Sequence, residues 1–471
     1  MDLTQWLDDN GASFIEISDQ VWHFAETRYR ESRSAALLAE TLEAAGFTVE
    51  RGVAGIPTAF VAEYGRGGPV IAILGEYDAL PGLSQEALTV QQAREAGGNG
   101  HGCGHNLLGA GALAATLAVK ESLDAGDGCG TIRFYGCPAE EGGAAKAFMV
   151  KAGLFEDVDI SLTWHPGAYN AGTSVNLLAR SAVYFRFRGL TAHAAADPFN
   201  GRSALDAVEL MNVGVNYLRE HIIPDARVHY VITHGGGSAP NVVPAEAESL
   251  YYVRAPRAEQ VQEVLDRVEA VAQGAAMMTG TECEMRFHSG TSNMVLNDTI
   301  TDLLHTKMVE IGAPEFDQDE KDFAREIART FLGKSMGLLD KLLGADHGEI
   351  RQRLADQFLV EEIMPNFKTN VVLPGSTDVA DVSWVTPTGQ IETTCFALGT
   401  PGHSWQIVAQ GGMSIGHKGM IFAAKVLALT AVEFMEKPDL LDQARGEFAA
   451  RTEGNPYLSL IPDGVPAPID G

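Results

Sequence analysis

Short apolar runs alternate with helix-forming segments up to about residue 179. Four of these runs have the length of a buried strand: TAFVAEY (58–64), PVIAILG (69–75), TIRFYG (131–136) and VDISLTW (158–164), and the first two are also bordered by Gly or Pro. The segments between them are rich in strong helix formers: AALLAETLEAA (35–45), NLLGAGALAATLAVKESL (106–123) and GAAKAFMVKAGLF (143–155). Strands that alternate with helices predict a layered α/β domain around a central mixed sheet.

The pattern changes near Ala179, where RSAVYFRFRG alternates apolar and polar residues with period two. This alternation is typical of an antiparallel strand with one exposed face. Three more strand-like runs and two helical patterns follow: RVHYVITHGGG, ESLYYVRAP, CEMRFHSG, 204–220 and 259–277. Their order, strand-helix-strand-strand-helix-strand, is that of a split βαβ unit. We therefore predict a ferredoxin-like α+β domain over 180–292, inserted into a larger domain formed by 1–179 and 293–471.

The segment 313–367 is charged and helical in pattern, with stretches such as DEKDFAREIARTFLGKSMGLLDKLL. We predict a helical insertion at the surface of the larger domain. Patterns of the kind that carry chemistry resume in PGSTDVADVSW and CFALGTPGHSW, and the proline-rich tail NPYLSLIPDGVPAPIDG is predicted to be extended.

Charge and cysteine content narrow the class of protein. The 471 residues include 62 acidic and 34 basic side chains, a net charge of −28, which makes nucleic acid and anionic membranes poor partners. The start MDLTQWLDDN lacks the features of a signal peptide, and no apolar run approaches the ~20 residues of a membrane span. The five cysteines are widely spread and odd in number, which favours free thiols in a reducing cytoplasm.

The stretch GHGCGHNLLG (100–109) introduces the candidate chemistry, because it carries His101, Cys103 and His105 on alternate positions. Other ligand-type side chains follow strand-like runs: Glu140 and Glu141 in CPAEEGG, His165 in TWHPG and His403 in GTPGHSW. In an open α/β sheet such residues gather at the carboxyl ends of strands, so we expect them to meet at one site.

One thiolate, three imidazoles and one or two carboxylates can hold one or two divalent metal ions, with zinc and manganese both compatible. A carboxylate that is not a ligand can then act as a general base toward a water molecule activated at the metals. Taken singly, each of these residues also fits a turn or a solvated position. Cys103 beside a histidine is in addition compatible with a cysteine hydrolase, although that hypothesis leaves the Glu pair and two histidines without a role. A third hypothesis is a non-catalytic metal-binding partner subunit.

The motifs GEYDALPG, GHGCGHN, PAEEGG, TWHPG and GTPGHSW occur in the order found in the M20 family of metallopeptidases, which the chain resembles nearly end to end. It is most similar to the amidohydrolases whose metal motif is Cys-Gly-His. The resemblance implies a catalytic α/β domain around two divalent metal ions, and an inserted domain that serves as lid and dimerisation domain. It departs from much of the family at Asn106, where an Asp is usual.

Roles for individual residues follow from the resemblance. The metal ligands it implies are Cys103, His105, Glu141, His165 and His403. It implies that Glu140 is the general base, and that Asp78 orients a ligand rather than binding metal. In the inserted domain, it implies that His193 reaches the scissile carbonyl across a dimer, and that Asn241 and Arg254 hold a substrate carboxylate. The remaining His101, His234 and His417 are predicted to be loop or cap histidines, and Cys137 and Cys395 core residues.

The resemblance implies a cytoplasmic hydrolase that cleaves the amide bond of a small N-acyl amino acid with a free carboxylate, such as aminobenzoyl-glutamate. A dipeptidase acting on basic dipeptides is the nearest alternative within the family. The expected metals are Mn or Zn, and the expected assembly is a homodimer or a heterodimer with a related A subunit. The sequence alone leaves the substrate, the metal and the partner open.

Overall fold

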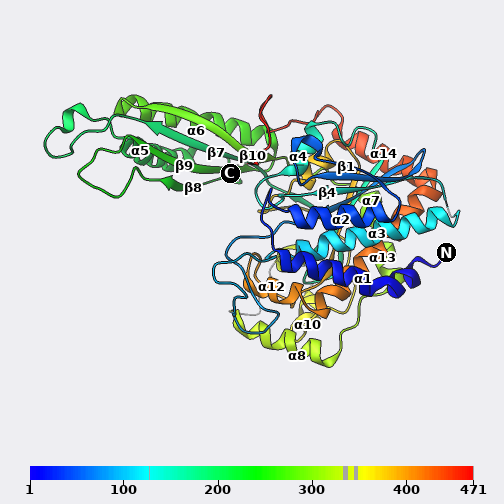
Figure 1. Ribbon diagram of the computed structural model, residues 1–471. Coiled ribbons are helices and arrows are strands. Elements are labelled where there is room, and N and C mark those ends of the chain that lie inside the picture. The colour runs from blue at the N-terminus through cyan, green and yellow to red at the C-terminus, as the bar shows by residue number, and fades with distance from the viewer. Residues whose placement is uncertain (127, 332–337, 344–347, 470–471) are drawn as a thin grey trace. The chain divides into compact units, whose positions relative to one another are not determined.

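The computed structural model describes residues 1–126, 128–331, 338–343 and 348–469. The chain forms two compact units (Figure 1). Each has its own core of buried hydrophobic side chains. The first consists of residues 1–176, 295–371 and 382–457, and the second of 177–294, 372–381 and 458–471. The short segments 372–381 and 458–471 thus cluster with the second unit, whereas the sequence analysis assigned them to the larger domain.

An eight-stranded mixed sheet organises the first unit. Its strands are β1 (Thr48–Arg51), β2 (Phe60–Arg66), β3 (Val70–Glu76), β4 (Gly130–Cys137), β5 (Ile160–Gly167), β6 (Ala171–Leu177), β11 (Phe367–Leu373) and β12 (Thr388–Thr394), in the order β1-β2-β4-β3-β5-β12-β6-β11. The central strands β4, β3, β5 and β12 run parallel to one another, while β2 and β6 pair antiparallel at either side. The predicted α/β class with a mixed sheet is confirmed.

The chain outside residues 177–294 also forms helices. They are α1 (Leu3–Phe24), α2 (Ser32–Ala44), α3 (His105–Asp124), α4 (Ala145–Lys151), α7 (Asp298–Ile311), α8 (Gln318–Ile327), α9 (Leu338–Leu343), α10 (Gly348–Leu354), α11 (Val379–Ser383), α12 (Trp405–Gly411), α13 (Ser414–Glu436) and α14 (Pro438–Thr452). Short 3₁₀ turns lie at Val53–Gly55 and Ala328–Thr330. Within the described part of the chain, no helix has the length and apolar character needed to cross a bilayer.

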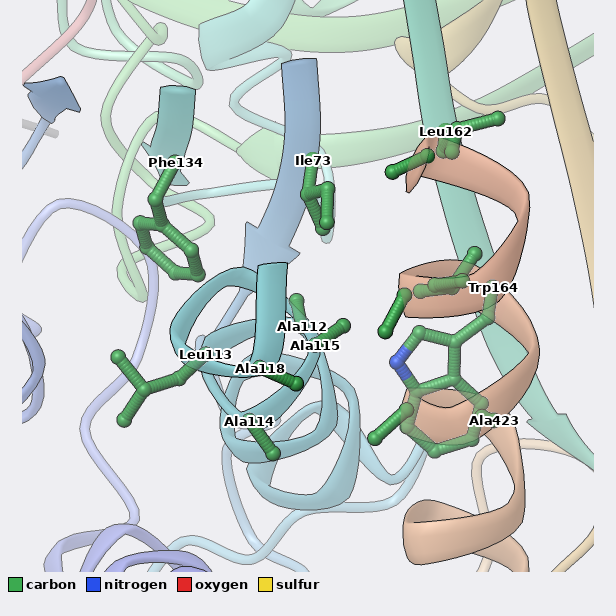
Figure 2. Close-up of a cluster of buried hydrophobic side chains, with 14 of the residues drawn as sticks. Ile73, Ala112, Leu113, Ala114, Ala115, Ala118, Phe134, Leu162, Trp164 and Ala423 are labelled. Carbon is green, nitrogen blue, oxygen red and sulfur yellow. The ribbon is translucent and has the colours of Figure 1, made fainter. Parts of the chain in front are cut away.

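Helix α3 is the centre of the larger core, because it is buried on nearly every side. Alanines 112, 114, 115 and 118 are fully buried, and their small side chains allow close packing against the sheet and α13. Figure 2 shows Phe134, Ile73 and Leu162 on neighbouring strands above α3, with Trp164 between α3 and Ala423 of α13. The Trp164 indole also donates a hydrogen bond to the carbonyl of Leu108 (3.1 Å). This packing holds the start of α3 against the ends of the central strands.

The second unit is a four-stranded antiparallel sheet with two helices. Its elements are β7 (Ala179–Arg188), α5 (Ala204–Leu218), β8 (Arg227–His234), β9 (Glu246–Ala255), α6 (Ala258–Thr279) and β10 (Glu282–Thr291), with 3₁₀ turns at Pro198–Asn200 and Arg219–His221. The strand order is β10-β7-β9-β8, so β8 is an edge strand. Phe185, Phe187, Tyr251 and Val253 pack with α5 and α6 in a separate core. The six elements occur in the order that the split βαβ pattern predicts.

The segment 313–367 is less helical than predicted. Helix α8 begins with a capping box, in which Asp317 and Glu320 bond reciprocally to each other's backbone N–H, and it ends at Ile327. Ala324 and Ile327 of α8 are buried in a cluster that includes Ala409 and Ile415, so this part is packed into the first unit rather than merely added at its surface. The predicted helix also covers 332–337 and 344–347, which lie outside the described residues.

Candidate active site

Four neighbouring parallel strands bring the candidate residues together at one edge of the large sheet. Asp78 comes two residues after the end of β3, and Glu140 and Glu141 follow β4. His165 lies among the last residues of β5, a small correction to the prediction that it follows the strand. His403 lies in the loop between β12 and α12. The carboxyl ends of parallel strands meet at the same edge, which is where α/β proteins build their sites.

Cys103 and His105 reach this edge from the start of α3. Gly104 adopts a left-handed conformation (φ 85°) that turns the chain into the helix at His105, which explains one glycine of GHGCGHN. Two glycines further along the helix permit close packing. A Cβ at Gly109 would lie 2.7 Å from the carbonyl oxygen of Glu76, and one at Gly111 would lie 2.8 Å from the Trp164 ring. The helix can therefore approach the strand ends closely enough to deliver His105.

The five predicted ligands form two groups that share Cys103. One group is Cys103, His105 and His165, the other is Cys103, Glu141 and His403, and within each group the candidate ligand atoms all lie within 4.8 Å of one another. The Cys103 Sγ is 3.4 Å from Nε2 of His165, and Nε2 of His403 is 3.2 Å from Oε1 of Glu141. Because Cys103 belongs to both groups, its thiolate would be available to an ion held by either of them.

The orientation of His105 fits a metal ligand. Its Nδ1 is 2.9 Å from Oδ1 of Asp78, so the ring donates its proton there and turns the lone pair of Nε2 into the site. That Nε2 is buried and lies 3.2 Å from Oε2 of Glu76, next to the candidate ligand atoms of Cys103 and His165. Together with the sulfur, nitrogen and oxygen donors around it, this atom fits a pair of divalent ions such as zinc or manganese.

The charges of the site favour an ionised cysteine. Burial raises the pKa of Cys103, as does the nearby Glu141, but the imidazoles of His165 and His105 outweigh both and bring the pKa to about 6. Burial lowers the pKa of His165, but the Cys103 thiolate outweighs it and raises that pKa to about 10. A thiolate at neutral pH suits a metal ligand and also a nucleophile. The grouping with Glu141 and His403, which a nucleophile does not need, favours the metal.

Glu140 belongs to a third group, with Glu76 and His105. The candidate ligand atoms of these three residues lie within 4.8 Å of one another. Glu76 is buried, and one of its carboxylate oxygens is 2.7 Å from the equally buried Nζ of Lys146. Burial alone would raise the pKa of Glu76, but Lys146 and then His105 outweigh it and lower that pKa. A buried lysine thus balances the negative charge that the site concentrates around Glu140.

Glu76 and Lys146 were missed by the sequence analysis. Glu76 had a usable signal, because it stands two positions before Asp78 at the end of a strand and should face the same side. Lys146 had none, since it lies inside a short apolar helix and its partner is far away along the chain.

Asp78 fixes two of the candidate ligands with one carboxylate. Its Oδ1 accepts the proton of His105 Nδ1, and its Oδ2 accepts the backbone N–H of Glu141 at 2.9 Å. The side chain is fully buried. Asp78 thus acts on the geometry of the site through its neighbours, which supports the orienting role implied by the resemblance.

Replacement of Asp78 by Asn is expected to weaken metal binding by about 10- to 100-fold. The amide can no longer accept both hydrogen bonds with a full negative charge, so the His105 ring loses its fixed orientation and part of its basicity. The measurement is the metal affinity of the purified variant by competition with a chelator, with Asp19→Asn, at an acid that contacts His417 away from the site, as control. Unchanged affinity in both variants would contradict the orienting role.

Three predicted residues belong to the second unit. Ala194 donates its backbone N–H to the carbonyl of Asn241 (2.9 Å), so the segments that carry His193 and Asn241 run side by side. Both side chains are exposed. Nδ1 of His193 faces the backbone N–H groups of Ala195 and Ala196 at 3.3 and 3.2 Å. Nδ1 must therefore accept, which leaves the proton on Nε2, a donor without a hydrogen-bond partner among the described residues.

Four other residues that the sequence analysis singled out are buried and belong to none of the ligand groups: Cys137, Cys395, His101 and Asn106. Cys137 and Cys395 are fully buried, and His101 is buried with Nε2 3.0 Å from the carbonyl of Val21. Asn106, the departure from the family pattern, donates to Oγ of Ser18 (3.1 Å) and to the carbonyl of Gly411 (2.9 Å). It ties α3 to α1 and α12, so the substitution of the usual acid leaves the group of five ligands intact.

A mixed α/β sheet with clustered thiol, imidazole and carboxylate groups at the ends of parallel strands is compatible with a metal-dependent hydrolase. The chain matches the family model described as Peptidase family M20/M25/M40 over residues 72–365. It is also 48% identical to the B subunit of p-aminobenzoyl-glutamate hydrolase from Escherichia coli, over 97% of this chain and 96% of that protein. The chain therefore belongs to peptidase family M20, and the resemblance found in the sequence is confirmed.

Other relatives share less identity. The Xaa-Arg dipeptidase of Mus musculus is 29% identical, over 96% of this chain and 93% of its own length. The A subunit of the Escherichia coli p-aminobenzoyl-glutamate hydrolase is 31% identical, over 56% of this chain and 71% of its own. Among solved structures, a dinuclear metal-binding M20 peptidase of Bacillus subtilis shares the fold with a TM-score of 0.57 at 19% identity, over 91% of this chain and 99% of the other. The chain is a hydrolase of amide or peptide bonds by its family.

Proposed function

We propose that this protein hydrolyses the amide bond of a small N-acyl amino acid with a free carboxylate, and that aminobenzoyl-glutamate is its substrate. The observation that carries the proposal is the pair of ligand groups that share Cys103. The name of the relative with 48% identity supports the choice of substrate.

Cys103, His105, Glu141, His165 and His403 would hold two divalent ions, Mn or Zn. When bound, such ions lower the pKa of a water molecule and polarise the carbonyl of the substrate. Glu140 accepts the proton of the attacking water at its carboxylate while the oxygen of that water bonds to the carbonyl carbon. It then returns the proton to the amine nitrogen as the C–N bond breaks. Lys146 neutralises the charge of Glu76, and this limits the negative charge next to the Glu140 carboxylate.

His193 is proposed to stabilise the oxyanion that forms at the carbonyl, acting across a dimer from the other chain. Its Nε2 carries a proton with no other partner among the described residues, because Nδ1 accepts from the backbone. Removal of a donor that stabilises a developing negative charge lowers kcat by about 10²–10³-fold. Asn241 and Arg254 are proposed to hold the substrate carboxylate.

The substrate is tested with a panel that contains aminobenzoyl-glutamate, acetyl amino acids, and dipeptides with acidic or basic C-terminal residues. We expect the highest kcat/KM on aminobenzoyl-glutamate. The similarity to a Xaa-Arg dipeptidase makes a dipeptidase the second candidate, and preferential cleavage of the basic dipeptides would establish it in place of the first. Activity that resists chelation and is abolished by iodoacetamide would instead support a cysteine hydrolase. Metal binding without turnover on any member would support a partner subunit.

The second unit is proposed to pair with another chain, either a second copy or a related A subunit. Its edge strand β8 exposes Val231 (55%) and Ile232 (42%), and Tyr217 of α5 is 77% exposed. An edge strand with exposed apolar side chains is ready to pair with a partner strand. The relatives named as the A and B subunits of one enzyme support a heterodimer.

Replacement of Val231 by Lys is expected to convert the dimer into monomers, because a charge on the edge strand opposes pairing. Analytical ultracentrifugation of the chain, alone and with its A-type relative, measures the effect. The matched control is Met277→Lys on α6, which is 84% exposed away from the edge strand. If the Val231 variant still sedimented as a dimer, the interface would not lie at β8.

The cytoplasm is proposed as the compartment. None of the five cysteines, all of which lie among the described residues, is in a disulfide, and Cys103 must stay reduced to act as a metal ligand. Thiol titration of the protein from cells, with five reactive groups after denaturation and metal removal, tests this proposal. A disulfide in the native protein would oppose it.

A further inference from the structure

A row of arginines crosses the sheet of the second unit at one register level. Arg180 of β7 lies directly opposite Arg254 of β9, and Arg254 lies opposite Arg227 of β8. Alternation along the strands turns these side chains to the face opposite α5 and α6, because their neighbours Ala179, Val253 and Val228 belong to the core on the helical side. Three like charges thus stand side by side, which is unfavourable unless an anion joins them.

The far end of the same face provides an internal comparison. There Arg186 pairs with Glu246 (2.6 Å), and Arg188 pairs with Glu284 (2.9 Å). Within the described ranges, Arg180 and Arg254 have no carboxylate partner. The chain carries an excess of 28 negative charges, so acidic partners are not scarce. The difference between the two ends of the face therefore indicates that the first arginines are kept available for a ligand.

Arg180 is the more unusual of the two. It is only 5% exposed, and its Nη1 is buried without a hydrogen-bond partner among the described residues. Its guanidinium lies 5.0 Å from the ring centroid of Tyr252, which also faces Arg254 at 5.9 Å. Arg254 is held by Oγ of Ser376 (2.9 Å) and the carbonyl of Pro374 (3.2 Å). A buried guanidinium with an unsatisfied N–H is costly, and a bound carboxylate would remove that cost.

We propose that Arg180 and Arg254 together bind the two carboxylates of an acidic amino acid, and that Arg180 is the residue that selects for the second carboxylate. Cross-strand neighbours have Cβ atoms about 4.5–5.5 Å apart, so two guanidinium forks can engage two carboxylates joined by a short chain. This inference rests on the proposed function, in which Arg254 holds the first carboxylate. It adds the residue that recognises the second carboxylate, and through it a preference for N-acyl derivatives of glutamate or aspartate over those of neutral amino acids.

The test compares aminobenzoyl-glutamate with aminobenzoyl-glutamine, which lacks only the second carboxylate charge. Arg180→Gln is expected to lower kcat/KM for the glutamate compound by about 10- to 100-fold and to change that for the glutamine compound by less than about twofold. Arg180→Lys, which keeps the charge without the fork, is expected to fall between. The control is Arg286→Gln, an exposed arginine of the same sheet that lies 4.4 Å from the Tyr184 ring centroid. Equal losses on both compounds would overturn the proposal.

A binding measurement keeps this inference separate from the proposed function. If the wild-type chain hydrolyses no amide, the proposed function fails, but calorimetry of the same chain with glutarate and with butyrate still tests the arginine pair. Glutarate is expected to bind at least about tenfold more tightly than butyrate, and Arg180→Gln, or Arg180→Lys if the Gln variant does not fold, should reduce that preference. Equal binding of the two acids by the wild type would refute the site.

Discussion

Replacement of Glu140 by Gln is expected to lower kcat by about 10²–10⁴-fold. Gln has nearly the same shape, so the loop after β4 should keep its structure, but the amide cannot accept a proton from water. Glu76 and His105, the other members of its group, remain in the variant, and none of the five proposed ligands is altered. The measurement is steady-state hydrolysis of aminobenzoyl-glutamate, with KM expected to change little.

Metal analysis of the same variant is the necessary control. The Glu140 variant should retain its metal, whereas Glu141→Gln should lose much of it, because Glu141 belongs to a ligand group and Glu140 does not share that group. The two neighbours thus serve as matched controls for each other. Full activity in the Glu140 variant would assign the base to another carboxylate, and Glu76 would be the first to examine.

Loss of Cys103 is expected to be the most damaging single change to the metal centre. Because Cys103 is common to both ligand groups, Cys103→Ala should weaken both ions, while His403→Ala, a member of one group, should weaken only one. We expect the metal content to fall from about two to below one per chain in the first variant, and to about one in the second. Elemental analysis after gel filtration measures both, and kcat/KM of the Cys103 variant should fall by at least about 10³-fold.

The opposite pattern would identify a thiol nucleophile. In that case Cys103→Ala would be inactive but keep its metal content, and the wild type would remain active in chelator. Its pKa of about 6 makes Cys103 reactive in the metal-free protein. Iodoacetamide should therefore modify the metal-free chain quickly and the metal-loaded chain slowly if the thiolate is a ligand.

The order of elements was the part of the fold that sequence patterns predicted best. The second unit follows its predicted order because period-two runs such as 180–189 and the helical pattern near 259–277 are long and distinct. Strands β6 and β12 were not predicted. Their sequences, AGTSVNL and TGQIETT, are short and polar, and they become strands because they pair with neighbours that are distant in the chain. Such tertiary pairing overrides local preference.

The candidate site could be predicted from its motifs because each motif places a ligand-type residue in a loop rich in Gly or Pro. Gly-rich loops and ligand-type residues after strand-like runs indicated one edge of a parallel sheet, and the structure brings Cys103, His105, Glu141, His165 and His403 together there. The Glu76–Lys146 ion pair could not be found in this way. It depends on two buried charges from separate elements, and the sequence near Lys146 contains no pattern that predicts a buried acidic partner.

The central claim is that two divalent ions held by these five ligands drive amide hydrolysis, and a titration tests it most directly. The metal-free chain, together with an A-type relative if one is required, is titrated with Mn²⁺ or Zn²⁺ while hydrolysis of aminobenzoyl-glutamate and bound metal are followed together. We predict no activity in the metal-free state and a plateau at about two ions per chain. Full activity in the metal-free state would contradict the account.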